Sequence, residues 1–344
     1  MALDVMKSPF TRRPRFLLAA LALAASSAAI AGGPKEALTM QNATGGATLF
    51  WTDPSDASTR DLFYGPGGRQ HEPHGPFTFV KEDLDGTNPK FVVRDTDGVK
   101  WKVKMGLEAR PETVATRLTW AAGYYANEDY FVPDIRVDGM PAHLHRGQKL
   151  LGPAGAVHNV RLKREPADEK KIGIWQWDKV GFAGSREWNG LRVLMAVINN
   201  WDLKDENNAV YSQGSQRVYM VSDLGASFGS ASRIMPSQDA KDNLNSYRRS
   251  KFIRRTGPDN VDFQVPAMPT LVYVFSPKEF FSRVRIEHLG RTVPRADAKW
   301  LGQLLARLSP EQIHDAFRAA GYSPEETAAF SGLLLERITV LTDL

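Results

Sequence analysis

The chain has 344 residues with a formal net charge of +5, and 42% of its residues are hydrophobic and 24% charged. This is the composition of an ordinary globular protein, and the length accommodates one large domain or two lobes with a cleft between them. Cysteine is absent, which excludes disulfides, cysteine nucleophiles, zinc–thiolate sites and cysteine-ligated iron–sulfur clusters.

Residues 1–31 have the pattern of a secretory signal peptide. A positively charged start precedes the apolar run Phe16–Ala31, and Ala29-Ile30-Ala31 fits a small-x-small cleavage site. The run has 16 residues, whereas a membrane span needs about 20. We therefore expect an exported protein, periplasmic or extracellular, without a stable membrane span; a retained membrane anchor is the alternative.

The basic character of the chain comes mostly from this N-terminal stretch. Removal of residues 1–31 takes away four Lys or Arg residues and one Asp, so the net charge falls from +5 to +2. The remaining charge gives no reason to expect nucleic-acid binding.

Residues 32–76 are rich in Gly, Pro, Asp, Ser and Thr, and we interpret them as an extended lead-in. Apolar residues in alternation then predict three successive strands. Turn residues separate these strands, and the first turn, Leu84–Pro89, contains Gly86. The predicted strands are Phe77–Asp83, Lys90–Asp95 and Val99–Met105.

A helix is predicted after the third strand, because Val114, Leu118 and Ala121 recur at helical spacing. Pro111 suits its first turn, and Gly123 suits its end. Two further strands, Tyr130–Val137 and Ala156–Arg164, complete a small β-rich N-lobe that spans residues 77–165.

Residues 166–344 are expected to form a mainly helical C-lobe. Leu191 and Leu194 lie on one face of a predicted helix that leads into Asn199, and a short hairpin follows up to Gly225. Near the C-terminus, Ser309-Pro310 and Ser323-Pro324 are typical helix starts, with serine as the N-cap and proline next to it.

The chain carries, in order, the groups that phosphoryl transfer from a nucleotide requires. Lys104 lies near the end of the third strand and can neutralise phosphates, and Glu112 in the following helix can hold that lysine. Asp202 and Asn207 lie five residues apart in one loop, and Asp223 follows 16 residues later. Amide and carboxylate oxygens of this kind suit Mg²⁺.

Two of these stretches resemble protein-kinase motifs. The segment Asn200–Asn208, NWDLKDENN, is similar to the catalytic loop H-R-D-L-K-x-x-N, with Asp202, Lys204 and Asn207 on its Asp, Lys and Asn. The segment Asp223–Gly225, DLG, is similar to D-F-G. HipA-type kinases share the Asp-to-Asn interval of five.

A third stretch, Lys104–Glu112, resembles the K-x-G-x-x-x-R-x-(D/E) run of phosphoinositide 3- and 4-kinases. The matching positions are Lys104, Gly106, Arg110 and Glu112. Together the motifs place the chain with atypical protein-kinase-like proteins, over roughly residues 77–230. The resemblance implies an α+β, bilobal fold with ATP and Mg²⁺ in the cleft.

The resemblance also implies roles for these residues. Lys104 would bind the α and β phosphates and be held by Glu112, and Gly86 lies where a glycine-rich loop would cover them. Asp202 would act as catalytic base or orient the acceptor, and Lys204 would steady the transferring group. Asn207 and Asp223 would hold Mg²⁺.

Several alternatives stay open. Lys102 shares a strand face with Lys104 and competes for the phosphate role. Asn200-Trp201 replaces the usual His-Arg, and Gly86 stands alone, so a catalytically weak pseudokinase that binds a ligand or partner is possible. A nucleotidyl (AMP) transferase is a third reading. The acceptor is a protein, lipid, sugar or small molecule.

Overall fold

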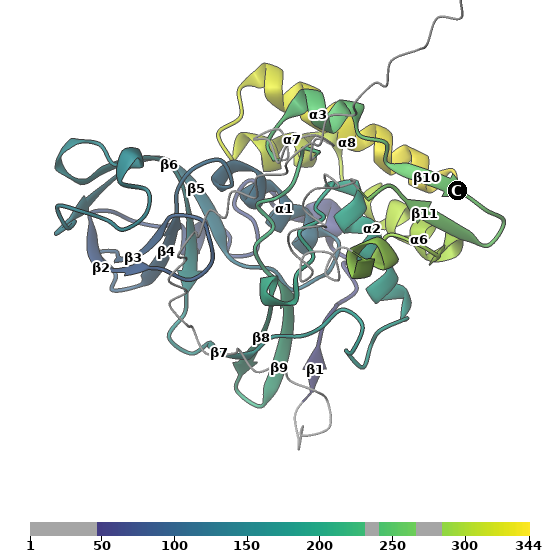
Figure 1. Cartoon of the computed structure of the whole chain (residues 1–344), viewed down its shortest axis with the longest axis horizontal. Coiled ribbons are helices and arrows are strands. Elements are labelled where there is room, and N and C mark those ends of the chain that lie inside the picture. Colours follow the sequence, from purple (N-terminus) through teal and green to yellow (C-terminus); the bar gives the residue numbers. More distant parts are fainter. Residues whose placement is uncertain (1–46, 231–240, 266–283) are drawn as a thin grey trace, which may run out of the picture. The chain divides into compact units, whose positions relative to one another are not determined.

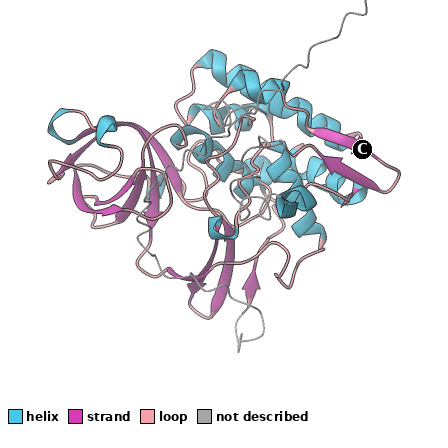
Figure 2. Cartoon of the chain, in the orientation of Figure 1, coloured by secondary structure: helices cyan, strands magenta, loops and turns pink. Residues whose placement is uncertain are grey.

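The computed structural model describes residues 47–230, 241–265 and 284–344. The predicted signal peptide and the first part of the predicted lead-in lie outside these residues. Strands and helices are both abundant in the described chain, which confirms the α+β fold class (Figure 2). None of the described helices is long and apolar enough to cross a membrane.

Five strands close into a barrel in the order β2-β3-β4-β6-β5 (Figure 1). Neighbouring strands are antiparallel except β2 and β5, which pair in parallel. Apolar residues such as Phe91, Trp101 and Leu162 fill the interior, and polar residues alternate with them. The strands are β2 (Phe77–Asp83), β3 (Lys90–Arg94), β4 (Lys100–Lys104), β5 (Asp129–Asp138) and β6 (Ala156–Glu165).

Helix α1 (Ala109–Ala121) follows β4, as the sequence predicts. It packs against β5 and β6 of the barrel and also against α7 (Pro310–Arg318). Leu118 on this helix belongs to a second hydrophobic core, distinct from the one inside the barrel. The described residues therefore form two cores, and α1 links the barrel to the second one.

Helices dominate the second half of the chain. Ser185 caps α2, and both α7 and α8 begin with a capping box, in which Ser309 pairs with Gln312 and Ser323 with Glu326. Serine followed by proline is therefore a correct helix-start signal here. The helices are α2 (Arg186–Val197), α3 (Leu244–Arg249), α6 (Arg295–Leu305), α7 (Pro310–Arg318) and α8 (Pro324–Thr342).

Two small sheets accompany these helices. The first has the order β1-β9-β8-β7, and the second has the order β10-β11-β12. The hairpin expected before Gly225 is β8 and β9. Their strands are β1 (Thr48–Leu49), β7 (Lys170–Gly173), β8 (Asn208–Gln213), β9 (Gln216–Val221), β10 (Ile253–Thr256), β11 (Asn260–Phe263) and β12 (Val293–Pro294).

The described part of the lead-in, residues 47–76, is more than an extended connection. Strand β1 pairs with β9, and Phe50, Ala57 and Leu62 are buried in the second core. Few apolar residues occur in this stretch, so its composition alone indicates a loop, and only tertiary packing shows that it belongs to the fold.

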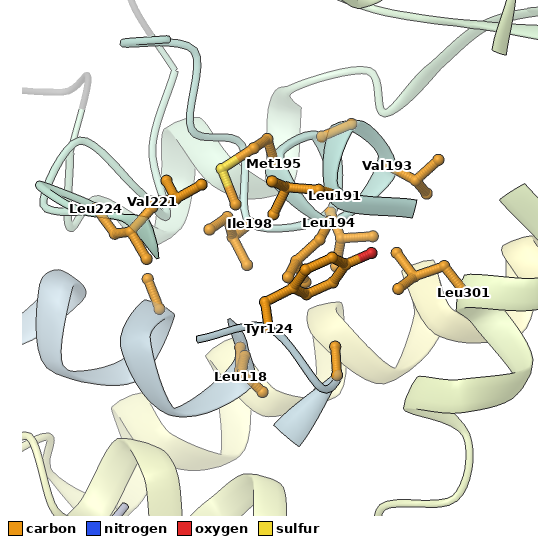
Figure 3. Close-up of a cluster of buried hydrophobic side chains, with 14 of the residues drawn as sticks. Leu118, Tyr124, Leu191, Val193, Leu194, Met195, Ile198, Val221, Leu224 and Leu301 are labelled. Carbon is orange, nitrogen blue, oxygen red and sulfur yellow. The ribbon is translucent and has the colours of Figure 1, made fainter. Parts of the chain in front are cut away.

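The second core extends to the DLG motif. Leu118 and Tyr124 pack with Leu194 of α2, and Leu224 of the motif lies in the same cluster (Figure 3). Trp175 and Trp177 are also buried there. The backbone that presents Asp223 is therefore anchored by apolar packing.

We predict that Leu194→Ala lowers the free energy of unfolding by about 2–5 kcal/mol, because Leu194 is fully buried and truncation leaves a cavity. Leu107→Ala is the matched control, since Leu107 is 54% exposed and should change stability by only about 0.5 kcal/mol. Urea unfolding followed by circular dichroism measures both. Equal effects would contradict this description of the core.

Candidate active site

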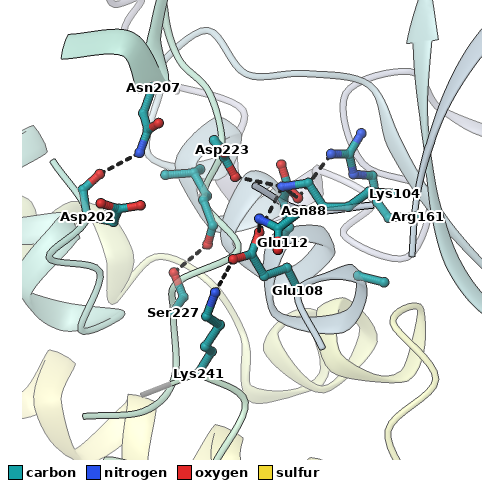
Figure 4. Close-up of polar contacts among 12 residues, drawn as sticks. Asn88, Lys104, Glu108, Glu112, Arg161, Asp202, Asn207, Asp223, Ser227 and Lys241 are labelled. Carbon is teal, nitrogen blue, oxygen red and sulfur yellow. Dashed lines mark hydrogen bonds and ion pairs between the residues drawn. The ribbon is translucent and has the colours of Figure 1, made fainter. Parts of the chain in front are cut away.

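One buried lysine collects carboxylates from separate parts of the chain. Lys104 Nζ lies 2.7 Å from Glu112 Oε2, 3.0 Å from Glu108 Oε2 and 2.6 Å from Asp223 Oδ1 (Figure 4). Only 3% of the Lys104 side chain is exposed. The ammonium is thus held in place by charge on three sides.

Each partner is positioned by the element that bears it. Lys104 is the last residue of β4, Glu108 precedes α1, and Glu112 lies in the first turn of α1. Asp223 follows β9 and has a positive φ of 58°, an uncommon conformation for a residue with a side chain. This left-handed backbone is part of the conformation in which Asp223 Oδ1 lies 2.6 Å from Lys104 Nζ.

Arg161 adds a second buried cation. It is the register partner of Lys104 across β4 and β6. Its Nη2 lies 3.0 Å from Glu112 Oε2, and its Nη1 lies 3.5 Å from Asp129 Oδ1. Glu112 is therefore shared by two cations.

Burial and the neighbouring charges shift the pKa values of Lys104, Asp223 and Glu112. Burial alone would lower the pKa of Lys104, but Glu112 and Asp223 together raise it above its usual value. Burial would raise the pKa of Asp223, but Lys104 brings it below its usual value. For Glu112, burial raises the pKa despite Arg161 and Lys104. Lys104 and Asp223 are therefore a charged pair at neutral pH.

Lys102 does not contact these carboxylates. Its Nζ lies 2.9 Å from Asp83 and 3.4 Å from Glu165, and its side chain is partly exposed. Of the two lysines left open by the sequence, the geometry favours Lys104 for the phosphate role.

Hydrogen bonds within the loop after α2 hold its conformation. Asn207 Nδ2 donates to the backbone carbonyl of Asp202 at 2.6 Å, and Lys204 Nζ lies 3.1 Å from Asp202 Oδ1. Asn200 Oδ1 accepts from the backbone N–H of Asp202, and Trp201 Nε1 donates to Asn199 Oδ1. Asn200 and Trp201 thus support the loop in place of His-Arg.

A cavity of about 1050 Å³ opens beside this cluster. Lys104, Glu112, Asn207 and Asp223 line it, so four predicted site residues meet at one cavity. Three others, Asp202, Lys204 and Gly86, are not among its lining residues. Gly86 lies in the β2–β3 turn with a φ of 66°.

The oxygen donors present fit a hard divalent cation. Carboxylate oxygens of Glu108, Glu112 and Asp223 lie within 4.8 Å of one another, and in this structure all three contact the Lys104 ammonium. Asn207 Nδ2 donates to the backbone carbonyl of Asp202. No described residue donates to Asn207 Oδ1, so this oxygen stays able to bind a metal. Asn207 and Asp223 are the residues that would hold Mg²⁺.

Sequence reasoning missed four residues of the cluster. Glu108 lies four residues after Lys104, inside the lipid-kinase-like stretch, and that interval was a usable signal. Asn88 Nδ2 donates to Glu108 Oε2 at 2.6 Å, and Lys241 pairs with the other oxygen of Glu108. Arg161, Asn88 and Lys241 reach the site only through strand register and tertiary folding.

A scan against protein-family models finds no match, and neither does a search of curated proteins. Solved structures do match. The Helicobacter pylori proinflammatory kinase CtkA aligns at 12% identity and a TM-score of 0.44, over 79% of this chain and 98% of that one. Golgi casein kinase aligns at 11% identity and 0.31, over 79% and 73%. Shewanella oneidensis HipA, in complex with HipB and DNA, aligns at 12% and 0.34, over 80% and 69%.

The identities and TM-scores are low. Similarity at this level does not determine the chemistry of the site, which depends on its own geometry.

We predict that Lys104→Met lowers the free energy of unfolding by about 3–5 kcal/mol at about pH 7, because it leaves buried carboxylates unpaired. Without Lys104, the folded-state pKa values of Glu108 and Asp223 should rise above their unfolded values. The folded variant then binds extra protons as the pH falls toward about 5, so its deficit relative to wild type should shrink.

The control for this prediction is Lys102→Met, whose partly exposed ion pairs should change stability by less than those of Lys104, by about 1 kcal/mol. Denaturant unfolding at the two pH values measures both variants. A Lys104→Met deficit that grows on acidification would refute the charged-cluster description.

Proposed function

We propose that this chain is an exported, ATP- and Mg²⁺-dependent phosphotransferase with an atypical kinase-like fold. The observation that carries the proposal is the contact of Lys104 with Glu112 of α1 and with Asp223 after β9, at the wall of a cavity that Asn207 also lines. A phosphate-binding lysine, its helix carboxylate and two metal ligands are the parts that this chemistry needs.

Each residue then has a distinct task. Lys104 binds the phosphates of the nucleotide, and Glu112 keeps its ammonium in place. Asn207 and Asp223 hold Mg²⁺, which neutralises phosphate charge when bound. Asp202 orients the acceptor hydroxyl or takes its proton, and Lys204 steadies the transferring group.

A binding-only function is the second candidate, and one observation favours it. The Asp202 carboxylate is paired with Lys204 and does not line the cavity. A pseudokinase would keep the nucleotide site and lack transfer.

Export is supported by residues 1–31 alone, and secretion of a reporter fused to this segment tests it.

We predict that ADP or ATP with Mg²⁺ raises the melting temperature of the chain lacking residues 1–31 by several degrees. Ligand at 100 times its Kd stabilises by about 2.7 kcal/mol. Asp223→Asn should abolish the metal-dependent part of the shift, because an amide is a weaker ligand than a carboxylate. The exposed Asp259→Asn is the charge-matched control. No shift in the wild type would remove the nucleotide hypothesis.

We further predict that Asp202→Asn keeps nucleotide binding but reduces transfer from γ-³²P-labelled ATP by about 10²–10⁴-fold, as expected for loss of a general base. Label on the protein's own chain and released phosphate are counted, with the exposed Asp138→Asn as control. A wild type that binds nucleotide without transferring label would support the pseudokinase, and transfer of α- but not γ-label would indicate AMP transfer.

A further inference from the structure

A row of three cations crosses the outer face of the barrel beside the cavity. Lys90 of β3 pairs in register with Lys104 of β4, and Lys104 pairs with Arg161 of β6. Directly paired residues on adjacent strands point to the same face of a sheet. All three line the cavity, so the row faces its interior.

Lys90 differs from its two neighbours in the row. Lys104 contacts three carboxylates, and Arg161 contacts Glu112 and Asp129. No described residue has a hydrogen bond to the Lys90 ammonium or a carboxylate within 4.0 Å of it, and Lys90 is only partly exposed. Burial lowers the pKa of Lys90, although Asp83 acts in the opposite direction. Within the described chain, Lys90 therefore has no direct ion-pair partner, although Asp83 and Asp223 act on it at longer range.

The position of Lys90 is also informative. Its ammonium reaches back to the β2–β3 turn, 3.7 Å from where a Cβ on Gly86 would lie. In this turn Gly86 is the one glycine, and Asn88 is already engaged with Glu108. A turn with one glycine offers little of the backbone N–H cradle that glycine-rich loops provide. The Lys90 side chain lies where the backbone N–H groups of a glycine-rich loop would otherwise contact phosphate.

The charges around Lys104 also indicate a role for Lys90 in binding an anion. Glu108, Glu112 and Asp223 surround one ammonium. This excess of negative charge would by itself repel an anionic ligand. Arg161 offsets Glu112, and Lys241 offsets Glu108. Lys90 is the cation of the row left without a carboxylate of its own, so it is the one able to add net positive charge to the cavity.

We propose that Lys90 is a second phosphate-binding residue, and that a ligand with at least two linked phosphates bridges the ammonium groups of Lys90 and Lys104. Adjacent strands lie about 4.8 Å apart, which suits neighbouring phosphates of one chain. The inference rests on the proposed function and names its ligand chemistry. A nucleoside di- or triphosphate and inorganic tripolyphosphate both contain such linked phosphates.

The alternative is a solvated lysine at the start of an exposed strand. Partial burial, the cavity wall and two nearby lysines argue against it, since an ammonium in such a place is costly unless an anion is supplied. A phosphate chain would supply that anion.

The test is Lys90→Met, compared with Lys81→Met as the matched control. Lys81 lies on the neighbouring strand β2, is exposed and does not line the cavity. Isothermal titration with MgADP, MgATP, magnesium tripolyphosphate and adenosine measures binding. Lys90→Met should weaken the three polyphosphate ligands about tenfold or more, because a charge-assisted hydrogen bond is lost, and should leave adenosine unchanged. Lys90→Arg should restore most of the affinity, and Lys81→Met should match wild type.

The outcomes separate this inference from the proposed function. A wild type that binds neither nucleotide nor tripolyphosphate overturns both. If the wild type binds MgATP and Lys90→Met binds it equally well, the inference is overturned while the proposed function stands. If tripolyphosphate binds and depends on Lys90 while adenosine does not bind, the inference holds and the phosphate chain, not the base, is what the cavity recognises.

Discussion

The buried ammonium of Lys104 is the point at which separate stretches of the chain meet. It ends a barrel strand, it is held by Glu112 of α1, and it reaches Asp223 beyond β9. A lysine in so buried a place is stable only if carboxylates surround it, and these carboxylates in turn need the lysine. The barrel, α1 and the β8–β9 hairpin must therefore all be correctly placed before this cluster can exist.

The two hydrophobic cores explain why this placement is stable. One core fills the barrel and fixes the register of β3, β4 and β6, and the other packs α1 with α2 and with Leu224. Register fixes which cations stand side by side, and the second core fixes the backbone of Asp223. Ion pairs alone give little net stability, so the polar cluster follows from the apolar packing around it.

Local sequence patterns predicted the barrel strands, α1 and the motif residues that meet at Lys104, and the reason is physical. Motif residues such as Lys104, Glu112 and Asp223 are identified by residue type and short intervals, and the structure brings these three together. Arg161 could not be found in this way, because its place depends on the pairing of β4 with β6, which local pattern does not reveal. Strand β1 was missed because its two residues pair with β9, far along the chain.

The same distinction bears on how phosphates would be recognised at the proposed site. A glycine-rich loop is visible in a sequence, because its backbone N–H groups require glycine at fixed positions. A row of side chains on paired strands leaves no such mark, since Lys90 and Lys104 are 14 residues apart and meet only through the hairpin. The lone Gly86, which at first indicates a weakened nucleotide site, is then consistent with a site whose phosphate contacts come from the sheet. Loss of the loop signature need not mean loss of phosphate binding, because cations across a rigid barrel wall are held in position at no further cost in backbone ordering.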